Sequence, residues 1–335
     1  MQRHFIKIML LFVFCAASVM ASQAVDPLPS WNEGKTKSAI IAFVRDVTDM
    51  KSPDFVPLPE RIATFDNDGT LWSEQPMYAE LFFVLSQIKS MVKDHPEWKN
   101  IEPYKSALAG DVKGIMASGK EKVVEMLVAS HANMTADEFR MQVDQWLSTA
   151  KNPEKGMLFT QMTFQPMVEL MAYLRAHGFR VYIVSGGGVD FMRVFTERLY
   201  GIAPEQVVGS TADAAFEMRN GVPTIVKKPK LLLVDDKTGK PVGIYRYIGR
   251  KPIFAAGNSD GDIQMLEYTT ISSEGKNAKG RLGVFVHHTD GLREFAYDRK
   301  AAFGKLDKGL DEAPARGWLL IDMKNDWKQI YPSAK

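Results

Sequence analysis

The sequence predicts an α/β protein: an open parallel sheet flanked by helices, with a separate block of helices inserted after the first strand. Three observations carry this prediction. Strand-like and helical segments alternate after residue 157, polar residues follow directly after several strands, and residues 76–156 contain mainly helical patterns. An open parallel sheet places its site at the carboxyl ends of its strands, so polar residues are expected there.

Length and charge limit the function classes. The 335 residues, of which 45% are hydrophobic, suffice for one large domain or two modest ones. The 42 basic and 40 acidic residues leave a formal net charge of +2, and the basic residues are spread along the chain. We therefore expect no nucleic-acid partner.

The N-terminus is typical of a secretory signal peptide over residues 1–24. Two basic residues precede an apolar run, and small residues follow at Ala21 and Ala24. An uncleaved membrane anchor is disfavoured, because the run is shorter than the roughly 20 residues that a span needs. We predict a periplasmic or secreted protein with no stable membrane insertion after cleavage. Cys15, the only cysteine, would be lost with the signal, so the mature protein would have no thiol.

The first half of the chain is expected to contain one strand and many helices. A helix over 37–50 ends at a Pro-rich segment, and the strand ERIATF over 60–65 follows. Thr135 and Glu138 have the spacing of a capping box at the start of the last helix in the inserted block. The predicted division is a first core part over 25–75, a helical cap over 76–156 and a second core part over 157–335.

The second half is expected to alternate between strands and helices. Asn220 and Gly221 predict the turn of a hairpin. The expected elements are a helix over 166–178, a strand over 179–185, a helix over 189–201, the hairpin over 214–226, a short helix over 240–249, a strand over 251–257 and a last strand over 281–288.

Polar residues gather at the ends of three of these strands. Asp66 and Asp68 lie one residue apart after the first strand, where their like charges repel. A divalent cation or a phosphate group bound at this position would each explain why the pair is placed there. The segment SGGG over 185–188 offers a hydroxyl and unhindered backbone N–H groups to phosphate. The segment GNSDGD over 257–262 is rich in the oxygen ligands that Mg²⁺ prefers. Between them, Lys240 precedes a short helix and could direct a cation at a phosphoryl group.

These motifs, in this order, resemble those of the haloacid dehalogenase (HAD) superfamily, in particular its phosphatase branch, similar to phosphoserine phosphatases. DNDGT matches the first motif, IVSGG the second, a lysine ahead of a short helix the third and GNSDGDIQML the fourth. The resemblance implies a Rossmann-like core with a helical C1 cap inserted after the first motif. It also implies a Mg²⁺-dependent phosphatase that forms an aspartyl-phosphate and acts on a small phosphorylated metabolite.

The resemblance assigns roles to individual residues. Asp66 would be the nucleophile, and Asp68 would protonate the leaving group and then activate water. Lys240 would neutralise charge, with Lys237 and Lys251 as alternatives for this third motif. The residues implied to bind phosphate are Thr70, Ser185, Gly186 and Gly187.

The implied metal ligands are Asp66, Asn258 and the backbone carbonyl of Asp68, and Asp262 is either a further ligand or a residue that supports the ligands. Asn258 departs from the family, which usually has Asp at this position, so it contributes an amide oxygen and no charge. The role of Asp260, an additional acid in this motif, is left open. Glu74 is a candidate for contact with a substrate ammonium group.

Several alternatives stay open at this point. The same scaffold could serve a phosphotransferase or a pyrophosphatase, and the neutral Asn258 is compatible with a non-catalytic phosphate-binding protein. A metal site at His287 and His288 is disfavoured, since no further His or Cys lies nearby in the sequence. Aromatic and apolar residues after the first motif are expected in the core or against the cap rather than in a substrate pocket: Trp72, Met77 and Phe82.

Overall fold

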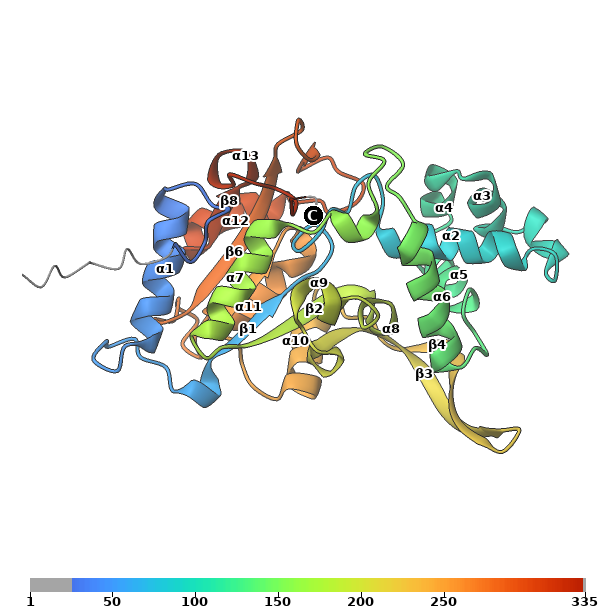
Figure 1. Cartoon of the computed structure of the whole chain (residues 1–335), viewed down its shortest axis with the longest axis horizontal. Coiled ribbons are helices and arrows are strands. Elements are labelled where there is room, and N and C mark those ends of the chain that lie inside the picture. Colours follow the sequence, from blue (N-terminus) through green and yellow to red (C-terminus); the bar gives the residue numbers. More distant parts are fainter. Residues whose placement is uncertain (1–25, 334–335) are drawn as a thin grey trace, which may run out of the picture.

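The structure, a computed structural model that describes residues 26–333, is built on one central sheet (Figure 1). Its strand order is β4-β3-β2-β1-β5-β6-β7, and β8 also pairs with β6. The pairs β1–β2, β1–β5, β2–β3, β5–β6 and β6–β8 are parallel, whereas β3–β4 and β6–β7 are antiparallel. The strands are β1 (Ile62–Phe65), β2 (Arg180–Gly188), β3 (Val207–Arg219), β4 (Val222–Leu233), β5 (Phe254–Gly257), β6 (Leu282–Thr289), β7 (Ala296–Tyr297) and β8 (Leu319–Asp322). The predicted α/β fold with a parallel core is confirmed.

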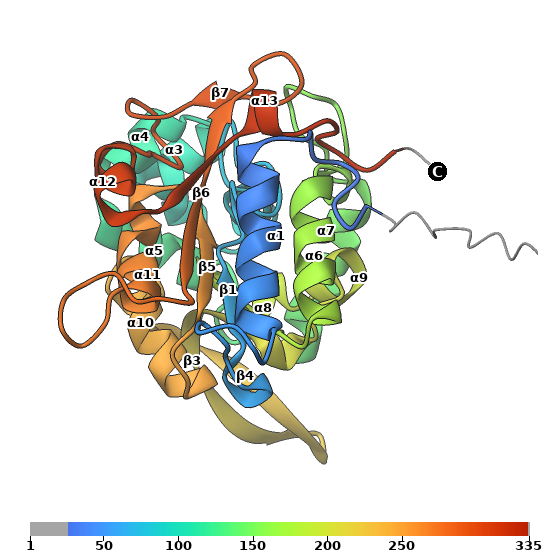
Figure 2. The ribbon, with the colours of Figure 1, turned by 90° about the vertical axis from the view of Figure 1, so that its left-hand side faces the viewer.

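Helices cover both faces of the sheet (Figure 2). On one face, α1 (Lys35–Thr48) and α7 (Gln165–Ala176) pack on Phe65 and Ile183 in one apolar cluster. On the other face, α11 (Ile263–Thr270) and α12 (Lys308–Arg316) share a second cluster with Val184 and Ala255. All four residues of β1 are buried, as expected for a central strand with helices on both sides. The remaining core helices are α8 (Val189–Met192), α9 (Thr196–Tyr200), α10 (Gly239–Gly243) with a π-helical turn (Ile244–Ile248), and α13 (Met323–Asp326).

The chain between β1 and β2 forms a group of helices beside the core (Figure 1). These are α2 (Ala79–Met91), α3 (Tyr104–Ala109), α4 (Val112–Ala117), α5 (Lys120–Ala129) and α6 (Ala136–Thr149), with a short 3-10 helix (Pro96–Asn100). Residues of α2, α4 and α5, such as Ile88 and Met126, form a separate apolar cluster, whereas Phe139 of α6 packs in the main core cluster. We call this group of helices the cap. Thr135 and Glu138 form the predicted capping box at the start of α6.

The predicted hairpin is formed by β3 and β4. Asn220 and Gly221 both have positive φ, 52° and 80°, as the tight turn requires. The hairpin projects from the core (Figure 1) and reaches the cap, where the backbone N–H of Lys227 donates to Met134 O at 2.9 Å. The hairpin therefore contacts the cap at a place distant from the two segments where the chain enters the cap after β1 and leaves it before β2.

Two local predictions were wrong. The expected single helix over 189–201 is split into α8 and α9, and Phe195 between them is buried and stacked on Trp72 at 4.5 Å. The strand expected over 179–185 continues as β2 to Gly188, with a register shift against β3 between Ser185 and Gly188. Glycine allows this pairing, because a Cβ on the neighbouring Gly209 would lie 2.7 Å from Gly187 O.

The predicted signal peptide lies outside the described residues. Within residues 26–333, no helix combines the length and the apolar character needed to cross a membrane.

Candidate active site

Asp66 is placed by the centre of the sheet. It follows β1 directly, and its backbone N–H donates to Ala256 O on β5 at 2.9 Å. The chain then turns tightly: Gly69 has a φ of 71°, and its N–H donates to Trp72 O at 2.8 Å. A side chain on Gly69 would be strained by this φ and would collide with Asn258 and Glu74. We call residues 66–74, which begin with the predicted nucleophile Asp66, the nucleophile loop.

Lys240 joins two of the predicted motifs to Asp66. Its Nζ lies 2.6 Å from Asp66 Oδ1 and 2.6 Å from Asp262 Oδ1, and it donates to Val184 O at 2.9 Å. Of the two other candidate lysines, Lys251 Nζ donates to Ile271 O. Lys237 contacts the fourth motif through its backbone N–H, which donates to Gly261 O. Of the three, Lys240 is the one that the fold places beside Asp66.

Burial and charge perturb the groups around this lysine. Burial raises the pKa of Asp66 to about 7, although the ammonium of Lys240 opposes this rise. Burial alone would lower the pKa of Lys240, but the carboxylates of Asp262 and Asp66 raise it overall. Lys240 is therefore a permanently charged cation at the carboxyl ends of β1, β2 and β5.

The carboxyl group of Asp68 is oriented by an indole. Trp72 Nε1 donates to Asp68 Oδ1 at 2.7 Å, and burial raises the pKa of Asp68 against this hydrogen bond. A carboxyl group whose pKa is raised is suited to give and take a proton. Trp72 is buried, as predicted, but its contact with Asp68 was not predicted.

The residues of the fourth motif have separate tasks. Asp262 Oδ2 accepts hydrogen bonds from the backbone N–H groups of Asn258 (3.0 Å) and Ser259 (3.1 Å), while Oδ1 accepts from Lys240. Both carboxylate oxygens of Asp262 are thus engaged by the protein. Asp260 points to α12, where it accepts from the backbone N–H of Gly309 at 2.9 Å, so it anchors that helix.

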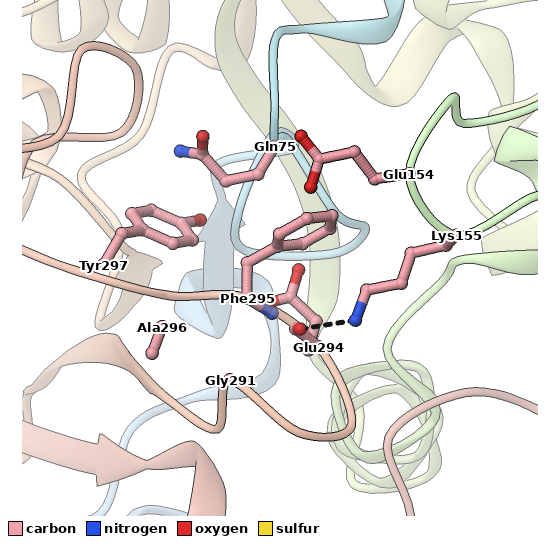
Figure 3. Close-up of a pocket in the computed structure, with 8 residues that line it drawn as sticks. All are labelled: Gln75, Glu154, Lys155, Gly291, Glu294, Phe295, Ala296 and Tyr297. Atoms are coloured by element: carbon pink, nitrogen blue, oxygen red, sulfur yellow. Dashed lines mark hydrogen bonds between the residues drawn. The ribbon is translucent and has the colours of Figure 1, made fainter.

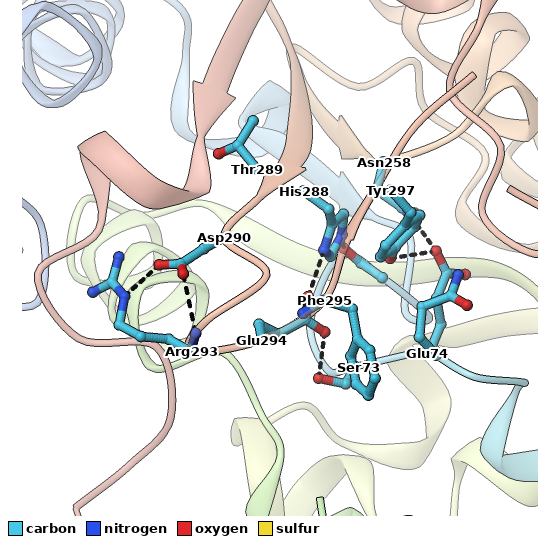
Figure 4. Close-up of polar contacts among 12 residues, drawn as sticks. Ser73, Glu74, Asn258, His288, Thr289, Asp290, Arg293, Glu294, Phe295 and Tyr297 are labelled. Atoms are coloured by element: carbon cyan, nitrogen blue, oxygen red, sulfur yellow. Dashed lines mark hydrogen bonds and ion pairs between the residues drawn. The ribbon is translucent and has the colours of Figure 1, made fainter. Parts of the chain in front are cut away.

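Asn258 is held by a buried carboxyl group (Figure 4). Its Nδ2 donates to Glu74 Oε1 at 2.6 Å, and its Oδ1 accepts from Thr70 Oγ1 at 3.2 Å. Tyr297 also donates to Glu74 Oε1, at 2.7 Å. Burial raises the pKa of Glu74 well above its usual value, although the hydrogen bond from Tyr297 opposes this. Glu74 therefore fixes which end of the Asn258 amide faces Thr70.

The donor set is compatible with Mg²⁺. Asp66 offers a carboxylate, Asp68 a backbone carbonyl and Asn258 an amide oxygen, all of them hard ligands. The orientation of Asn258 supports this fit, because its nitrogen is turned to Glu74 and its oxygen is not. Within residues 26–333, no three His, Cys, Asp or Glu side chains gather as a metal cluster, so such a site would depend on amide and backbone oxygens as well.

The family model for haloacid dehalogenase-like hydrolases matches residues 63–267, more than half of the chain. The matched region runs from β1, before Asp66, to α11, after Asp262, and so contains the whole constellation around Lys240. The chain belongs to the haloacid dehalogenase-like hydrolase family.

Solved structures with a similar arrangement share little sequence with this HAD hydrolase. A protein of unknown function from Bordetella pertussis Tohama I is 16% identical, covers 79% of this chain and 99% of its own, and has a TM-score of 0.49. A probable phosphoserine phosphatase from Vibrio cholerae is 19% identical, with 75% and 64% covered and a TM-score of 0.37. No curated protein sequence matches the chain.

The cap contributes a carboxyl group to the second motif of the HAD hydrolase. Glu80 Oε2, from α2, accepts a hydrogen bond from the backbone N–H of Gly188 at 2.8 Å. Burial raises the pKa of Glu80 to about 7. In the same motif, the buried hydroxyl of Ser185 accepts from Gly187 N–H at 3.4 Å. The sequence carried no signal for Glu80, because it lies in a helix of the cap, 108 residues from its partner.

A pocket of about 290 Å³ opens between Gln75 and Tyr297 (Figure 3). Tyr297 lines it and donates to Glu74, whereas Asp66 and Asp68 do not line it. The chemistry around Lys240, not this pocket, therefore defines the site. The lining residues are Gln75, Glu154, Lys155, Gly291, Glu294, Phe295, Ala296 and Tyr297.

Proposed function

We propose that this HAD hydrolase is a Mg²⁺-dependent phosphomonoesterase that hydrolyses a small phosphorylated metabolite in the periplasm or outside the cell. One observation supports this most: Lys240 is hydrogen-bonded to both Asp66 and Asp262 at the centre of the sheet edge. A cation fixed beside a buried carboxylate stabilises the negative charge that a transferring phosphoryl group carries. The family membership supports a hydrolase, and the substrate class follows from the proposed chemistry.

The proposed reaction has two steps. A carboxylate oxygen of Asp66 attacks phosphorus, and the bond from phosphorus to the leaving oxygen breaks as Asp68 gives that oxygen a proton. Asp68 then takes a proton from water, which attacks the aspartyl-phosphate and releases phosphate and free Asp66. Lys240 remains charged throughout, so it can offset the charge on Asp66 and phosphate in both steps.

Mg²⁺, held by Asp66, the Asp68 carbonyl and Asn258, would supply further positive charge to the phosphate oxygens. Asp262 would hold Lys240 and the backbone of Asn258 in place instead of binding the cation, since both of its oxygens are engaged. Backbone N–H groups of Gly186 and Gly187 and the hydroxyls of Ser185 and Thr70 are the proposed phosphate contacts.

Replacing the nucleophile tests this proposal. Asp66→Asn keeps the size of the side chain but removes its nucleophilicity, so we expect kcat on a panel of phosphorylated metabolites to fall by about 10³-fold or more. The exposed Asp94→Asn on the cap is the control and should behave as wild type. Circular dichroism would verify that both variants are folded. Equal turnover by folded Asp66→Asn and wild type would refute the role of Asp66.

A further inference from the structure

A segment outside the four motifs is hydrogen-bonded to the nucleophile loop (Figure 4). We call residues 288–297, which run from the end of β6 through β7, the clamp segment. His288 Nε2 lies 2.7 Å from Gly69 O, and Glu294 Oε1 accepts from Ser73 Oγ at 2.7 Å. Tyr297 donates to Glu74. The clamp segment thus contacts the nucleophile loop at three successive points.

Both ring nitrogens of His288 face oxygen acceptors. Nε2 faces the carbonyl of Gly69, which can only accept, so this nitrogen carries a proton. Nδ1 lies 3.0 Å from Glu294 Oε2. One more proton therefore sits between these two atoms, and it belongs either to the ring or to the carboxyl group.

The surroundings of Glu294 decide where this proton lies. Glu294 is fully buried, and two other donors point at its carboxyl group: Ser73 Oγ at Oε1 and the backbone N–H of Phe295 at Oε2, 2.6 Å away. If the proton belonged to Glu294, Oε2 would have to carry it, because Oε2 is the atom that faces His288. Oε2 already accepts a hydrogen bond from the backbone N–H of Phe295. Hydrogen bonds donated to a carboxylate favour its ionised form.

We propose that His288 is an imidazolium ion, paired with the Glu294 carboxylate, and that it positions the nucleophile loop by holding the carbonyl of Gly69. A charged donor makes a shorter and stronger hydrogen bond than a neutral one. Gly69 separates Asp68 from Thr70, so fixing its carbonyl fixes the peptide planes on which both neighbouring side chains depend. His288 is a positioning residue, since it does not touch Asp66 or Lys240.

The other groups around His288 are compatible with a cation. The ring of Tyr297 stacks on the imidazole at 4.3 Å, and Phe164 lies at 5.8 Å. Tyr331 donates to or accepts from Ser73 Oγ at 2.8 Å. Lys155, the nearby ammonium group, donates to the backbone carbonyl of Glu294 and lies over the ring of Phe295.

The charge is tested directly by ¹⁵N NMR of the histidine side chains in the full mature protein at about pH 7. We expect His288 to show protons on both nitrogens, and Glu294→Gln, which removes the negative charge at nearly constant shape, to leave one nitrogen without a proton. A singly protonated His288 ring in wild type would overturn the ion pair. This measurement does not depend on any enzymatic activity.

The positioning role rests on the proposed phosphatase activity and is tested by kinetics. His288→Phe removes both hydrogen bonds, so we expect kcat to fall by about ten- to a hundredfold, with KM changed far less. His288→Gln keeps one amide donor for Gly69 and should retain part of the rate. His287→Gln is the matched control: its side chain is partly exposed and lies 3.5 Å from Asp298.

The outcomes separate the two proposals. A folded His288→Phe or His288→Gln with the kcat of His287→Gln would refute positioning by His288. If His288→Phe does not fold, His288→Gln alone decides this point. Wild-type protein without phosphatase activity would refute the proposed function, while the NMR result would still decide the charge of His288.

Discussion

Among single residues, Asp68 illustrates how burial and one hydrogen bond prepare a group for proton transfer. Its carboxyl group is held by Trp72 Nε1, and its pKa is raised by burial. An asparagine at this position could still accept from the indole through its amide oxygen. The substitution therefore removes the exchangeable proton and leaves the geometry nearly unchanged.

This predicts a dependence on the leaving group in Asp68→Asn. An alkoxide needs a proton as it leaves, whereas p-nitrophenolate is a good leaving group without one. We expect the loss in rate to be larger on an alkyl phosphate than on p-nitrophenyl phosphate, measured where formation of the aspartyl-phosphate limits turnover. Equal losses on both substrates would show that Asp68 does not protonate the leaving group.

A second prediction concerns the pair of Glu74 and Asn258. Because Glu74 accepts from Asn258 Nδ2 and so fixes the direction of the amide oxygen, Glu74→Gln should weaken Mg²⁺ binding by about tenfold. Isothermal titration calorimetry with Mg²⁺ alone measures this without turnover. In the Glu74→Gln background, Asn258→Asp should restore affinity, because acid and amide then exchange places. Unchanged Mg²⁺ affinity in Glu74→Gln would contradict this role, and the exposed Glu97→Gln serves as control.

Among the elements, the β3–β4 hairpin presents two different faces. Val226 is fully buried and pairs with Thr135 at the start of α6, whereas its neighbour Ile225 is 47% exposed. Successive side chains of a strand point to opposite faces, so Val226 faces the cap at this point and Ile225 faces away from it. Lys227 contacts the cap through the ring of Phe139, 4.7 Å from its Nζ, and forms an ion pair with Asp190 on α8 of the core.

The two neighbours should therefore differ in their effect on stability. Val226→Ala removes two buried carbon atoms and should lower the free energy of unfolding by about 2 kcal/mol. Ile225→Thr changes an exposed position and should stay within about 0.5 kcal/mol of wild type. Urea unfolding followed by circular dichroism measures both. Similar losses for the two variants would show that the hairpin does not pack on the cap through this face.

For the whole molecule, Asp235 links stability to pH. Within the described part of the chain, both of its carboxyl oxygens are buried and lack a hydrogen-bond partner. Burial raises its pKa to about 8, against the effect of Lys240. The folded state therefore keeps a proton that the unfolded chain, with a pKa near 3.8, releases at much lower pH.

The sign of this effect follows from linkage. A raised carboxyl pKa stabilises the folded state fully below the unfolded value, and this contribution is lost as the pH rises from about 4 to about 8. We expect Asp235→Asn to equal wild type in stability near pH 4 and to exceed it near pH 8. Urea unfolding at both values measures the difference, and Asp94→Asn is the exposed control. A variant no more stable than wild type at pH 8 would contradict this role of Asp235.

The sequence alone determined the features that depend on neighbouring residues. The buried β1 ahead of Asp66, the capping box of Thr135 and Glu138, and the turn at Asn220 and Gly221 were all predicted, because each is encoded within a few residues. The order of the motifs also predicted the α/β fold and the family. Parallel strands bring their carboxyl ends to one edge of a sheet, so motifs at strand ends are brought together by the topology itself.

Only the tertiary structure decided which side chains meet around that edge. Lys240 reaches Asp66 across 174 residues, Glu74 reaches Asn258 across 184 and His288 reaches Gly69 across 219. Local sequence patterns do not indicate how such distant segments are aligned with one another. The short helix that follows Lys240 favoured it over Lys237 and Lys251, but its distance from Asp66 depends on where α10 packs against the sheet. Hydrogen bonds between side chains depend on distance and direction, and both are set by the packing of the whole chain.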